Sequence, residues 1–314
     1  EISTRDWSSD VCSSDLHLPS RLETLDMTVD LPVRQYELDE YKSDEKPTWC
    51  PGCGDFGVLN AVYRAMRTRN FAPHEVVAVS GIGCSSRIPY FISTYGFHSV
   101  HGRATPVATG VHVARPDLKT LVFSGDGDAF AIGAGHVVHA MRRNLDLTYV
   151  IMDNAIYGLT KGQTSPTSGL GFHTATTPAG NPEQALNPLA LAITCGATFV
   201  ARGFSAEPAK LADLILEGLD HKGFSFIDVY SPCPTFNKVN TFKTYKDEVE
   251  WLPSEYDATN AASALAHATA DDKRYLGVFL RREAPTYAEQ VQKSHTGTEA
   301  DRAKVLGGMF KRYS

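Results

Sequence analysis

Short, unbroken runs of apolar residues alternate along the middle of the chain with stretches in which apolar residues recur every three or four positions. The first pattern predicts strands that are buried on both faces, and the second predicts helices. The predicted strands are residues 76–79, 120–124, 147–152, 197–201 and 224–230. The predicted helices are residues 56–66, 106–114, 129–142, 186–195 and 206–219. Strands that alternate with helices indicate right-handed crossovers, so we expect an α/β fold with a parallel sheet covered by helices on both faces.

The two ends of the chain lie outside this alternation. Residues 1–45 follow no apolar period, so we expect them to form an N-terminal tail. Residues 46–240 hold the predicted sheet, and residues 241–314 are expected to form a C-terminal extension that covers it or docks another subunit. The first sixteen residues resemble translated sequencing-adaptor sequence, which would make them, Cys12 included, a foreign scar. A native, mobile tail is the alternative.

The charge balance narrows the choice of partners. The 314 residues include 30 Lys and Arg against 36 Asp and Glu, a formal net charge of −6. Binding to nucleic acid favours a basic surface, so we expect no nucleic-acid partner. No apolar run approaches the roughly 18 residues that cross a membrane, and no basic segment followed by an apolar run predicts a secretory signal. We therefore expect a cytoplasmic protein without a membrane partner.

Five further cysteines, an odd number at irregular spacing, argue for a reducing compartment and against a disulfide framework. Cys50 and Cys53 stand in a Pro-Gly turn that can direct two thiolates at one centre. Cys84 and Cys233 each follow a predicted strand, where open α/β sheets place their sites. Cys195 lies in an apolar, helix-like stretch and is interpreted as a core residue. The four loop thiols could hold an iron–sulfur cluster or a zinc ion.

A Gly-Asp-Gly-Asp sequence at residues 125–128 directly follows the strand at 120–124 and precedes a predicted helix. A strand, a glycine turn and a helix start expose backbone N–H groups toward an anion, and a divalent cation would join the carboxylate to phosphate. The next predicted strand ends beside Asn154. Gly-Asp-Gly, 26 intervening residues (128 to 153) and Asn have the spacing of the thiamine diphosphate motif. The pattern lacks the third glycine of a dinucleotide fingerprint.

Five motifs occur together in one order: WCPGCGDFG, GIGCSS, HGRATPVATG, GDGDAFAIG and DNAIYGLTKGQTSPTS. Over about residues 46–240 they resemble the β subunit of the 2-oxoacid:ferredoxin oxidoreductases, most closely the 2-oxoglutarate type. The resemblance implies the fold of the diphosphate-binding (PP) domain of thiamine diphosphate enzymes. It also implies three cofactors: thiamine diphosphate, Mg²⁺ and one 4Fe–4S cluster.

Residue by residue, the resemblance implies the following sites. The cluster ligands would be Cys50, Cys53, Cys84 and Cys233. The Mg²⁺ ligands would be Asp126, Asn154 and the main-chain carbonyl of Ile156. The diphosphate would be lined by Gly125, Gly127, Gly158, Leu159 and Thr160. The cofactor rings would lie along Ile82, Gly83, Cys84 and Ser85.

The implied activity is oxidative decarboxylation of 2-oxoglutarate to succinyl-CoA with electron transfer to ferredoxin. Thiamine diphosphate supplies the electron sink that this reaction requires, and an α subunit would supply the glutamate that activates it. Pyruvate or a branched-chain 2-oxo acid is the alternative substrate. A non-catalytic α/β scaffold that holds zinc with the same four thiols is the alternative of another class.

Other polar residues near these motifs each allow two interpretations. Arg87 could bind an acid group of the substrate, or it could be a surface arginine at a helix start. His101 could carry protons near the cofactor, as could His98, and a structural hydrogen bond is the alternative for both. His136 and His139 lie three positions apart on one helix with no third ligand in sight, so we interpret them as structural.

Overall fold

The computed structural model describes residues 34–294, 304 and 308. The chain divides between residues 35 and 36 into two units, of which the second holds nearly all of the described residues. The interpretation of the first sixteen residues as a scar, Cys12 included, lies outside the described residues, as does most of the expected tail. The second unit holds every helix and strand of the described residues.

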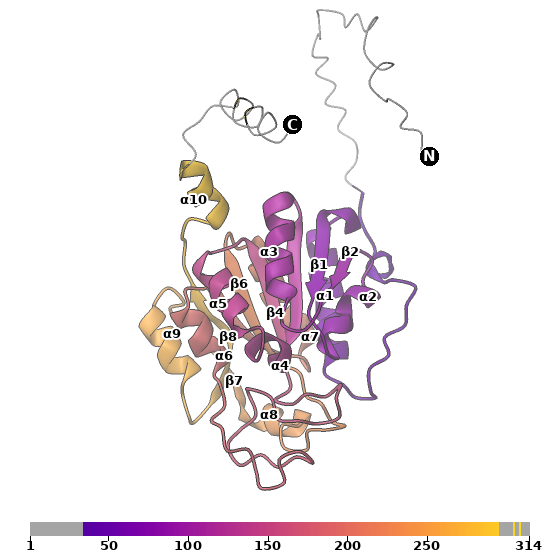
Figure 1. Cartoon of the computed structure of the whole chain (residues 1–314), viewed down its shortest axis with the longest axis vertical. Coiled ribbons are helices and arrows are strands. Elements are labelled where there is room, and N and C mark those ends of the chain that lie inside the picture. Colours follow the sequence, from indigo (N-terminus) through magenta and orange to yellow (C-terminus); the bar gives the residue numbers. More distant parts are fainter. Residues whose placement is uncertain (1–33, 295–303, 305–307, 309–314) are drawn as a thin grey trace, which may run out of the picture. The chain divides into compact units, whose positions relative to one another are not determined.

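An eight-stranded sheet forms the centre of this unit, in the order β2-β1-β3-β4-β6-β5-β8-β7. All strand pairs are parallel except the pair of β5 and β8. The strands are β1 Val76–Ser80, β2 Tyr95–His98, β3 Lys119–Gly125, β4 Leu147–Asp153, β5 Phe199–Phe204, β6 Phe224–Tyr230, β7 Val249–Trp251 and β8 Arg274–Arg281. Figure 1 shows the parallel strands side by side with their loops gathered at one end. The expected α/β class is confirmed.

Helices connect most of these strands. They are α1 Asp55–Arg69, α2 Ile88–Phe91, α3 Ala104–Ala114, α4 Asp126–Phe130, α5 Ala134–Arg142, α6 Pro188–Thr194, α7 Pro208–Asp220, α8 Phe242–Glu248, α9 Ala261–Ala268 and α10 Tyr287–Ser294. Several begin where the sequence satisfies free backbone N–H groups: the side chain of Asn187 accepts from Ala190 at the start of α6, and Pro208 begins α7.

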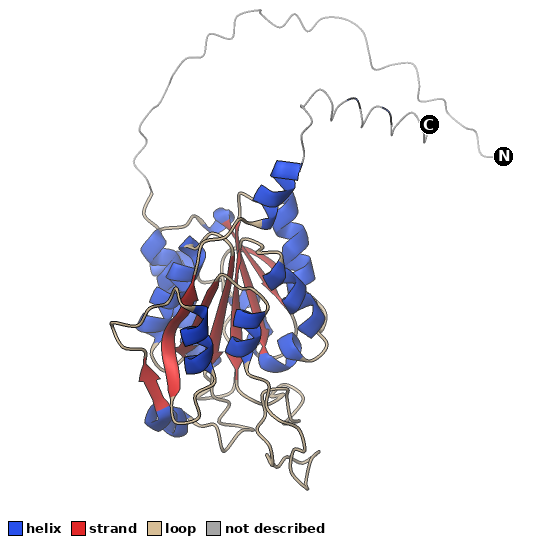
Figure 2. Ribbon diagram, turned by 90° about the vertical axis from the view of Figure 1, so that its left-hand side faces the viewer, coloured by secondary structure: helices blue, strands red, loops and turns tan. Residues whose placement is uncertain are grey.

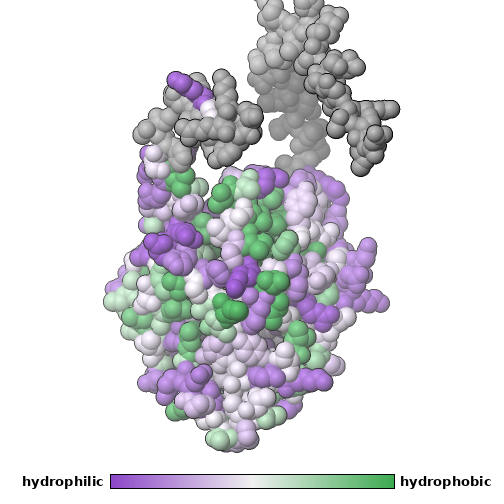
Figure 3. Space-filling view, in the orientation of Figure 1, coloured by the Kyte–Doolittle hydropathy of each residue, from purple (hydrophilic) through white to green (hydrophobic). Residues whose placement is uncertain are grey.

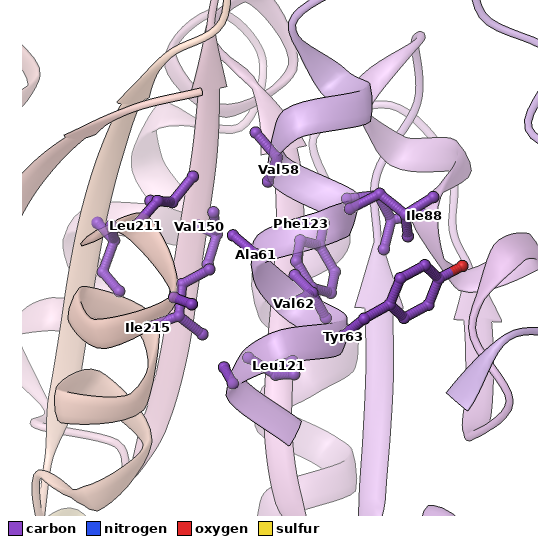
Figure 4. Packing of buried hydrophobic residues seen from close by; sticks show 14 of the residues in the cluster. Val58, Ala61, Val62, Tyr63, Ile88, Leu121, Phe123, Val150, Leu211 and Ile215 are labelled. Atoms are coloured by element: carbon purple, nitrogen blue, oxygen red, sulfur yellow. The ribbon is translucent and has the colours of Figure 1, made fainter. Parts of the chain in front are cut away.

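Helices cover both faces of the sheet, as expected (Figure 2). On one face, α1 and α7 lie side by side and bury Val62 and Ile215 against Phe123 and Val150 (Figure 4). On the other face, α3, α5, α6 and α9 pack against the alternate side chains of the same strands. Strand residues that point to opposite faces are both buried, which explains why the strands read as unbroken apolar runs.

One approach between elements is unusually close. A Cβ atom built on Gly57 in α1 would lie 2.0 Å from the backbone oxygen of Ser205, which follows β5. No side chain fits there without moving backbone. Glycine at this position therefore sets the distance between α1 and the loop that begins α7.

The helix predicted over residues 129–142 is two helices, α4 and α5, with a break between them. At the break, a Cβ atom on Gly102 would lie 2.6 Å from the backbone nitrogen of Gly133. The backbone of one loop therefore packs directly on the backbone of the other. The chain turns out of the helix at residues 131–133 to allow this contact.

Strands β2, β7 and β8 are absent from the sequence prediction. The four residues of β2 are all exposed, so they show no core-facing pattern. Arg274–Arg281 carries charges at both ends and a glycine, Gly277, at a φ of 119°. β7 and β8 extend the sheet beyond β5, so this part of residues 241–314 contributes to the core. Among the described residues, no helix has the length and apolar character needed to cross a membrane.

Candidate active site

The site lies at the carboxyl ends of the parallel strands. From β1 the chain moves outward to β2, then returns to β3 on the other side of β1, so the direction of winding reverses between β1 and β3. Open α/β sheets bind ligands at such a switch point. The loop after β1 carries Cys84, and β3 runs directly into Asp126. These two loops meet, since a Cβ atom on Gly125 would lie 3.0 Å from Oγ of Ser85.

Two buried carboxylates lie close together at this edge. Asp126 follows β3 and is 1% exposed, and Asp153 ends β4 and is 5% exposed. The hydroxyl of Thr167 lies 2.7 Å from Oδ2 of Asp126 and 2.8 Å from Oδ1 of Asp153. One side chain from a distant loop thus bridges the ends of two neighbouring strands.

A tight turn follows Asp153. Ala155 adopts a left-handed conformation with a φ of 54°, and its N–H donates to Oδ1 of Asp153 at 3.0 Å. The next N–H, that of Ile156, donates to Oδ1 of Asn154 at 3.1 Å. The Asn237 side chain also stabilises the turn, donating a 2.9 Å hydrogen bond to the carbonyl of Asn154. The two predicted Mg²⁺ ligands of this segment thus flank a residue whose backbone is fixed on both sides.

Burial controls the electrostatics of these carboxyls. It raises the pKa of Asp126 to about 6, and hydrogen bonds from Ser165 and Thr167 partly offset the effect. Burial also raises the pKa of Asp153 well above its usual range, and the negative charge of Asp126 adds to the shift. Two carboxylates so close together favour a divalent cation.

The four predicted cluster thiols occupy one region of the same edge. A Cβ atom on Gly158 would lie 3.5 Å from Sγ of Cys233 and 3.9 Å from Sγ of Cys84. Burial raises the pKa of Cys84 to about 11, and Cys233 and Cys50 are near enough to contribute. Burial also raises the pKa of Cys53 far above its usual range, with added effects of Asp55, Cys233 and Cys84. Burial also raises the pKa of Cys233, so without a bound metal burial favours the protonated form of the Cys53, Cys84 and Cys233 thiols.

Direct contacts join the two cysteine-bearing segments that are furthest apart in sequence. The N–H of Gly54 donates to the carbonyl of Pro232 at 3.0 Å, and Ser231 donates its hydroxyl to Asp55 at 2.7 Å. The other oxygen of Asp55 is buried and accepts no hydrogen bond from the described residues. Burial raises the pKa of Asp55 to about 6. The Cys-x-x-Cys turn and the Cys233 loop are thus held together by the protein alone.

A cavity of about 570 Å³ lies beside this region. It is lined by Glu45, Lys46, Thr48, Ile82, Gly83, Arg87, Tyr90, Phe91, His98 and Leu159. The cavity thus brings together Arg87, two of the residues predicted to follow the cofactor rings, and one predicted to line the diphosphate. Thr160, also predicted for the diphosphate, is exposed and hydrogen-bonds with Gln163 in the same loop.

The histidines differ in their surroundings. Nδ1 of His101 lies 2.8 Å from Oδ1 of Asp128, and the His101 side chain is 40% exposed. Because an ionised carboxylate only accepts, the proton sits on Nδ1 and Nε2 is available. Nδ1 of His98 lies 2.8 Å from the carbonyl of Ser86 and ties β2 to the loop after β1. This contact favours the structural interpretation of His98.

The remaining predicted positions lie away from the site. Cys195 packs against the core on the α6 face. Within the described residues, no three His, Cys, Asp or Glu side chains converge closely enough to hold a single metal ion, and this includes His136 and His139.

Sequence reasoning missed three residues: Asp128, Asp153 and Thr167. All three stand inside motifs quoted above, but neither their burial nor their partners can be read from the motif letters. Asp128 accepts from His101, from the N–H of Gly102 at 2.7 Å and from Ser124 at 2.9 Å. Only the fold shows that its carboxylate organises this loop.

Comparison with known proteins identifies the family. Residues 46–229 match a family model described as thiamine pyrophosphate enzyme, C-terminal TPP binding domain. Residues 233–296 match a model of the C-terminal part of the pyruvate ferredoxin oxidoreductase beta subunit. A 2-oxoacid:ferredoxin oxidoreductase subunit beta from Saccharolobus solfataricus is 43% identical over 256 residues, which are 77% of this chain and 84% of that protein. The chain belongs to the β subunits of the 2-oxoacid:ferredoxin oxidoreductases.

Relatives of this β subunit include proteins named for 2-oxoglutarate. A 2-oxoglutarate synthase subunit KorB from Methanocaldococcus jannaschii is 40% identical, over 78% of this chain and 91% of that protein. A solved 2-oxoglutarate:ferredoxin oxidoreductase from Magnetococcus marinus, with 2-oxoglutarate, coenzyme A and succinyl-CoA bound, is 45% identical with a TM-score of 0.83. The match covers 86% of this chain and 96% of that chain. The resemblance stated from the motifs, the thiamine diphosphate domain and membership of an oxidoreductase are thereby confirmed.

Proposed function

We propose that this β subunit takes part in the oxidative decarboxylation of 2-oxoglutarate to succinyl-CoA, with electrons passing through one 4Fe–4S cluster to ferredoxin. The observation that carries the proposal is the loop after β1. It places Cys84 near the other predicted cluster ligands, while Ile82 and Gly83 of the same loop line the cavity. One rigid segment would thus set the distance between the cofactor rings and the cluster.

The residues at the ends of β3 and β4 fit Mg²⁺ and a diphosphate. Asp126 would supply a carboxylate, Asn154 an amide oxygen and Ile156 a main-chain carbonyl, and Mg²⁺ prefers oxygen ligands of these kinds. The buried and mutually repelling carboxylates of Asp126 and Asp153 support a divalent cation here. The bound cofactor supplies the electron sink for loss of carbon dioxide.

The proposed activity favours a cluster over zinc at the four thiols. Cysteine thiolates bind zinc as well as iron–sulfur clusters. Zinc has no redox chemistry, whereas a reaction that reduces ferredoxin must pass on single electrons.

Two side chains near the cofactor region support roles in substrate handling. Arg87 lines the cavity, and a guanidinium matches the geometry of a second carboxylate, which favours 2-oxoglutarate over pyruvate. The His101 ring, held by Asp128, keeps Nε2 available to accept or release a proton.

An exposed apolar surface supports an α subunit as partner. Tyr90, Tyr95, Phe97, Val100 and Ile132, which we call the β2 edge patch, are each more than half exposed. Tyr90 also lines the cavity, so the patch borders the cofactor region. Apolar side chains also gather over α3 in the face shown in Figure 3. Surfaces of this kind mark protein interfaces.

The test is a substrate panel with the assembled αβ enzyme, measured as 2-oxo acid- and coenzyme A-dependent reduction of ferredoxin. We expect 2-oxoglutarate to give the highest kcat/KM, and Arg87→Gln to reduce this preference. A colourless, zinc-containing protein without turnover would refute the proposal. Preference for pyruvate or a branched-chain acid would refute the substrate assignment alone.

A further inference from the structure

Thr167 occupies a position that the described reaction does not explain. Its hydroxyl contacts one buried carboxylate from the end of β3 and one from the end of β4, at 2.7 and 2.8 Å. A hydroxyl carries one proton and can donate to only one carboxylate at a time. The other contact then brings oxygen lone pairs together, which is unfavourable unless a cation or another proton is near. No ion pair within the described residues includes Asp126 or Asp153.

The loop around Thr167 is fixed in place by further hydrogen bonds. Ser168 donates its hydroxyl to the carbonyl of Ala155 at 2.7 Å and accepts from the N–H of Ser165 at 2.8 Å. Asn181 donates to the carbonyl of Ser168 at 3.0 Å. Thr167 is therefore presented by an ordered turn that is attached to the strand ends. A hydroxyl held in this way can restrict the orientation of the carboxylates it contacts.

We propose that Thr167 is a positioning residue that orients Asp126 for its Mg²⁺ ion and couples the 158–168 loop to cofactor binding. The inference rests on the proposed function for the identity of the metal. The hydrogen bond from Thr167 removes rotational freedom of the Asp126 carboxylate before the metal arrives. It also joins the loop that carries Gly158 and Leu159 to the metal site, so the loop and the metal stabilise each other.

The test uses the assembled αβ complex and calorimetric titration of Mg²⁺ at saturating thiamine diphosphate. Thr167→Val removes the hydroxyl at nearly constant volume, and we expect Mg²⁺ to bind about tenfold more weakly, the usual effect of one hydrogen bond to a charged group. Thr167→Ser restores the hydroxyl and should return the affinity to within about twofold of the wild type, allowing for its missing methyl group. Thr164→Val makes the same change three residues away, where the hydroxyl makes no hydrogen bond within the described part of the chain, and should bind Mg²⁺ normally.

Each outcome is informative. Wild-type affinity in Thr167→Val, or failure of Thr167→Ser to rescue it, would overturn the positioning role. Equal weakening in Thr164→Val would overturn it too, because the effect would then belong to the loop as a whole. Unfolding of the metal-free variants, followed by circular dichroism, shows whether the fold is intact. Absence of Mg²⁺-dependent thiamine diphosphate binding in the wild type would instead refute the proposed function.

Discussion

The carboxyls of Asp55, Asp126 and Asp153 are buried at the edge of the sheet where the cofactors are proposed to bind, and burial raises the pKa of each. Burying an unpaired carboxylate is costly, so such groups persist where they have a partner or a ligand to meet. Asp55 lies beside the thiols, and the other two lie beside the turn that carries Asn154. The chain without cofactors therefore holds buried carboxyls whose charges the proposed Mg²⁺ and cluster would offset.

Replacing a proposed metal ligand should abolish cofactor binding and leave the fold intact. Asp126→Ala and Asn154→Ala should each weaken Mg²⁺-dependent thiamine diphosphate binding more than about a hundredfold, because changes one shell further from a metal already cost about ten- to hundredfold. Calorimetry measures the loss. Asp213→Ala, an exposed carboxylate on α7, is the matched control. Undiminished affinity in both ligand variants would remove the metal assignment.

Serine in place of a cluster ligand should eliminate the cluster. We expect near-zero iron and sulfide in Cys50→Ser, Cys53→Ser, Cys84→Ser and Cys233→Ser, since each thiolate would bond one iron. Cys195→Ser is the control and should retain the full content, because that side chain packs in the α6 core. Iron analysis and the visible absorption band measure the outcome. A requirement for Cys195, or full iron without Cys233, would contradict the ligand set.

At the scale of elements, close backbone packing holds the site together. α1 begins directly after Cys53 and packs on α7, so its position fixes one side of the thiol region. The contact between Gly57 and Ser205 sets how near α1 can come. A larger residue at position 57 should mainly lower the free energy of unfolding. It should also affect the cluster, because moving α1 displaces the Cys-x-x-Cys turn that precedes it.

Gly57→Ala should therefore destabilise the fold. The added methyl would lie 2.0 Å from backbone, and overpacking of this kind costs about 1–3 kcal/mol of unfolding free energy. Gly110→Ala is the opposite case, because a Cβ atom there has open space in the middle of α3, and alanine should raise stability by about 0.5–1 kcal/mol. Urea unfolding compares the two. Equal effects of the same sign would show that helix propensity, not packing, governs both sites.

The sequence predicts those elements that are buried on both faces. β1, β3, β4 and β6 appear as apolar runs because helices cover both of their faces. β2 is exposed, so its residues form no apolar run from which a strand could be predicted. Likewise, motif spacing locates Asp126 and Asn154, but the bridge through Thr167 depends on how a loop 41 positions away folds back, which no local pattern encodes.

At the scale of the whole molecule, the chain leaves apolar surface beside its cofactor region. Tyr95 and Phe97 of the β2 edge patch lie on an edge strand, whose free backbone groups and aromatic side chains would otherwise favour aggregation. A partner subunit would cover it. On the proposed function, residues of that partner subunit would complete the reactive centre.

The isolated chain should consequently be inactive. Loaded with Mg²⁺, thiamine diphosphate and its cluster, it should reduce no viologen dye with any 2-oxo acid, because the proposed activating glutamate belongs to the α subunit. Adding α subunit should restore coenzyme A-dependent reduction. A chain treated identically but carrying Asp126→Ala should stay inactive with α subunit present. Sustained turnover by an α-free preparation would show that the chain carries its own activating group.

The left-handed turn at Ala155 carries a conflict between folding and function. A residue other than glycine at a φ of 54° costs about 1 kcal/mol, so Ala155→Gly should make the metal-free chain more resistant to urea. The same change would make the backbone of the turn more flexible. The Asn154 side chain and the Ile156 carbonyl would then be directed toward the proposed Mg²⁺ position for less of the time. We expect Ala155→Gly to gain thermal stability and lose Mg²⁺ affinity. In that case natural selection has retained a residue that lowers the stability of the fold because it keeps the metal ligands oriented for binding.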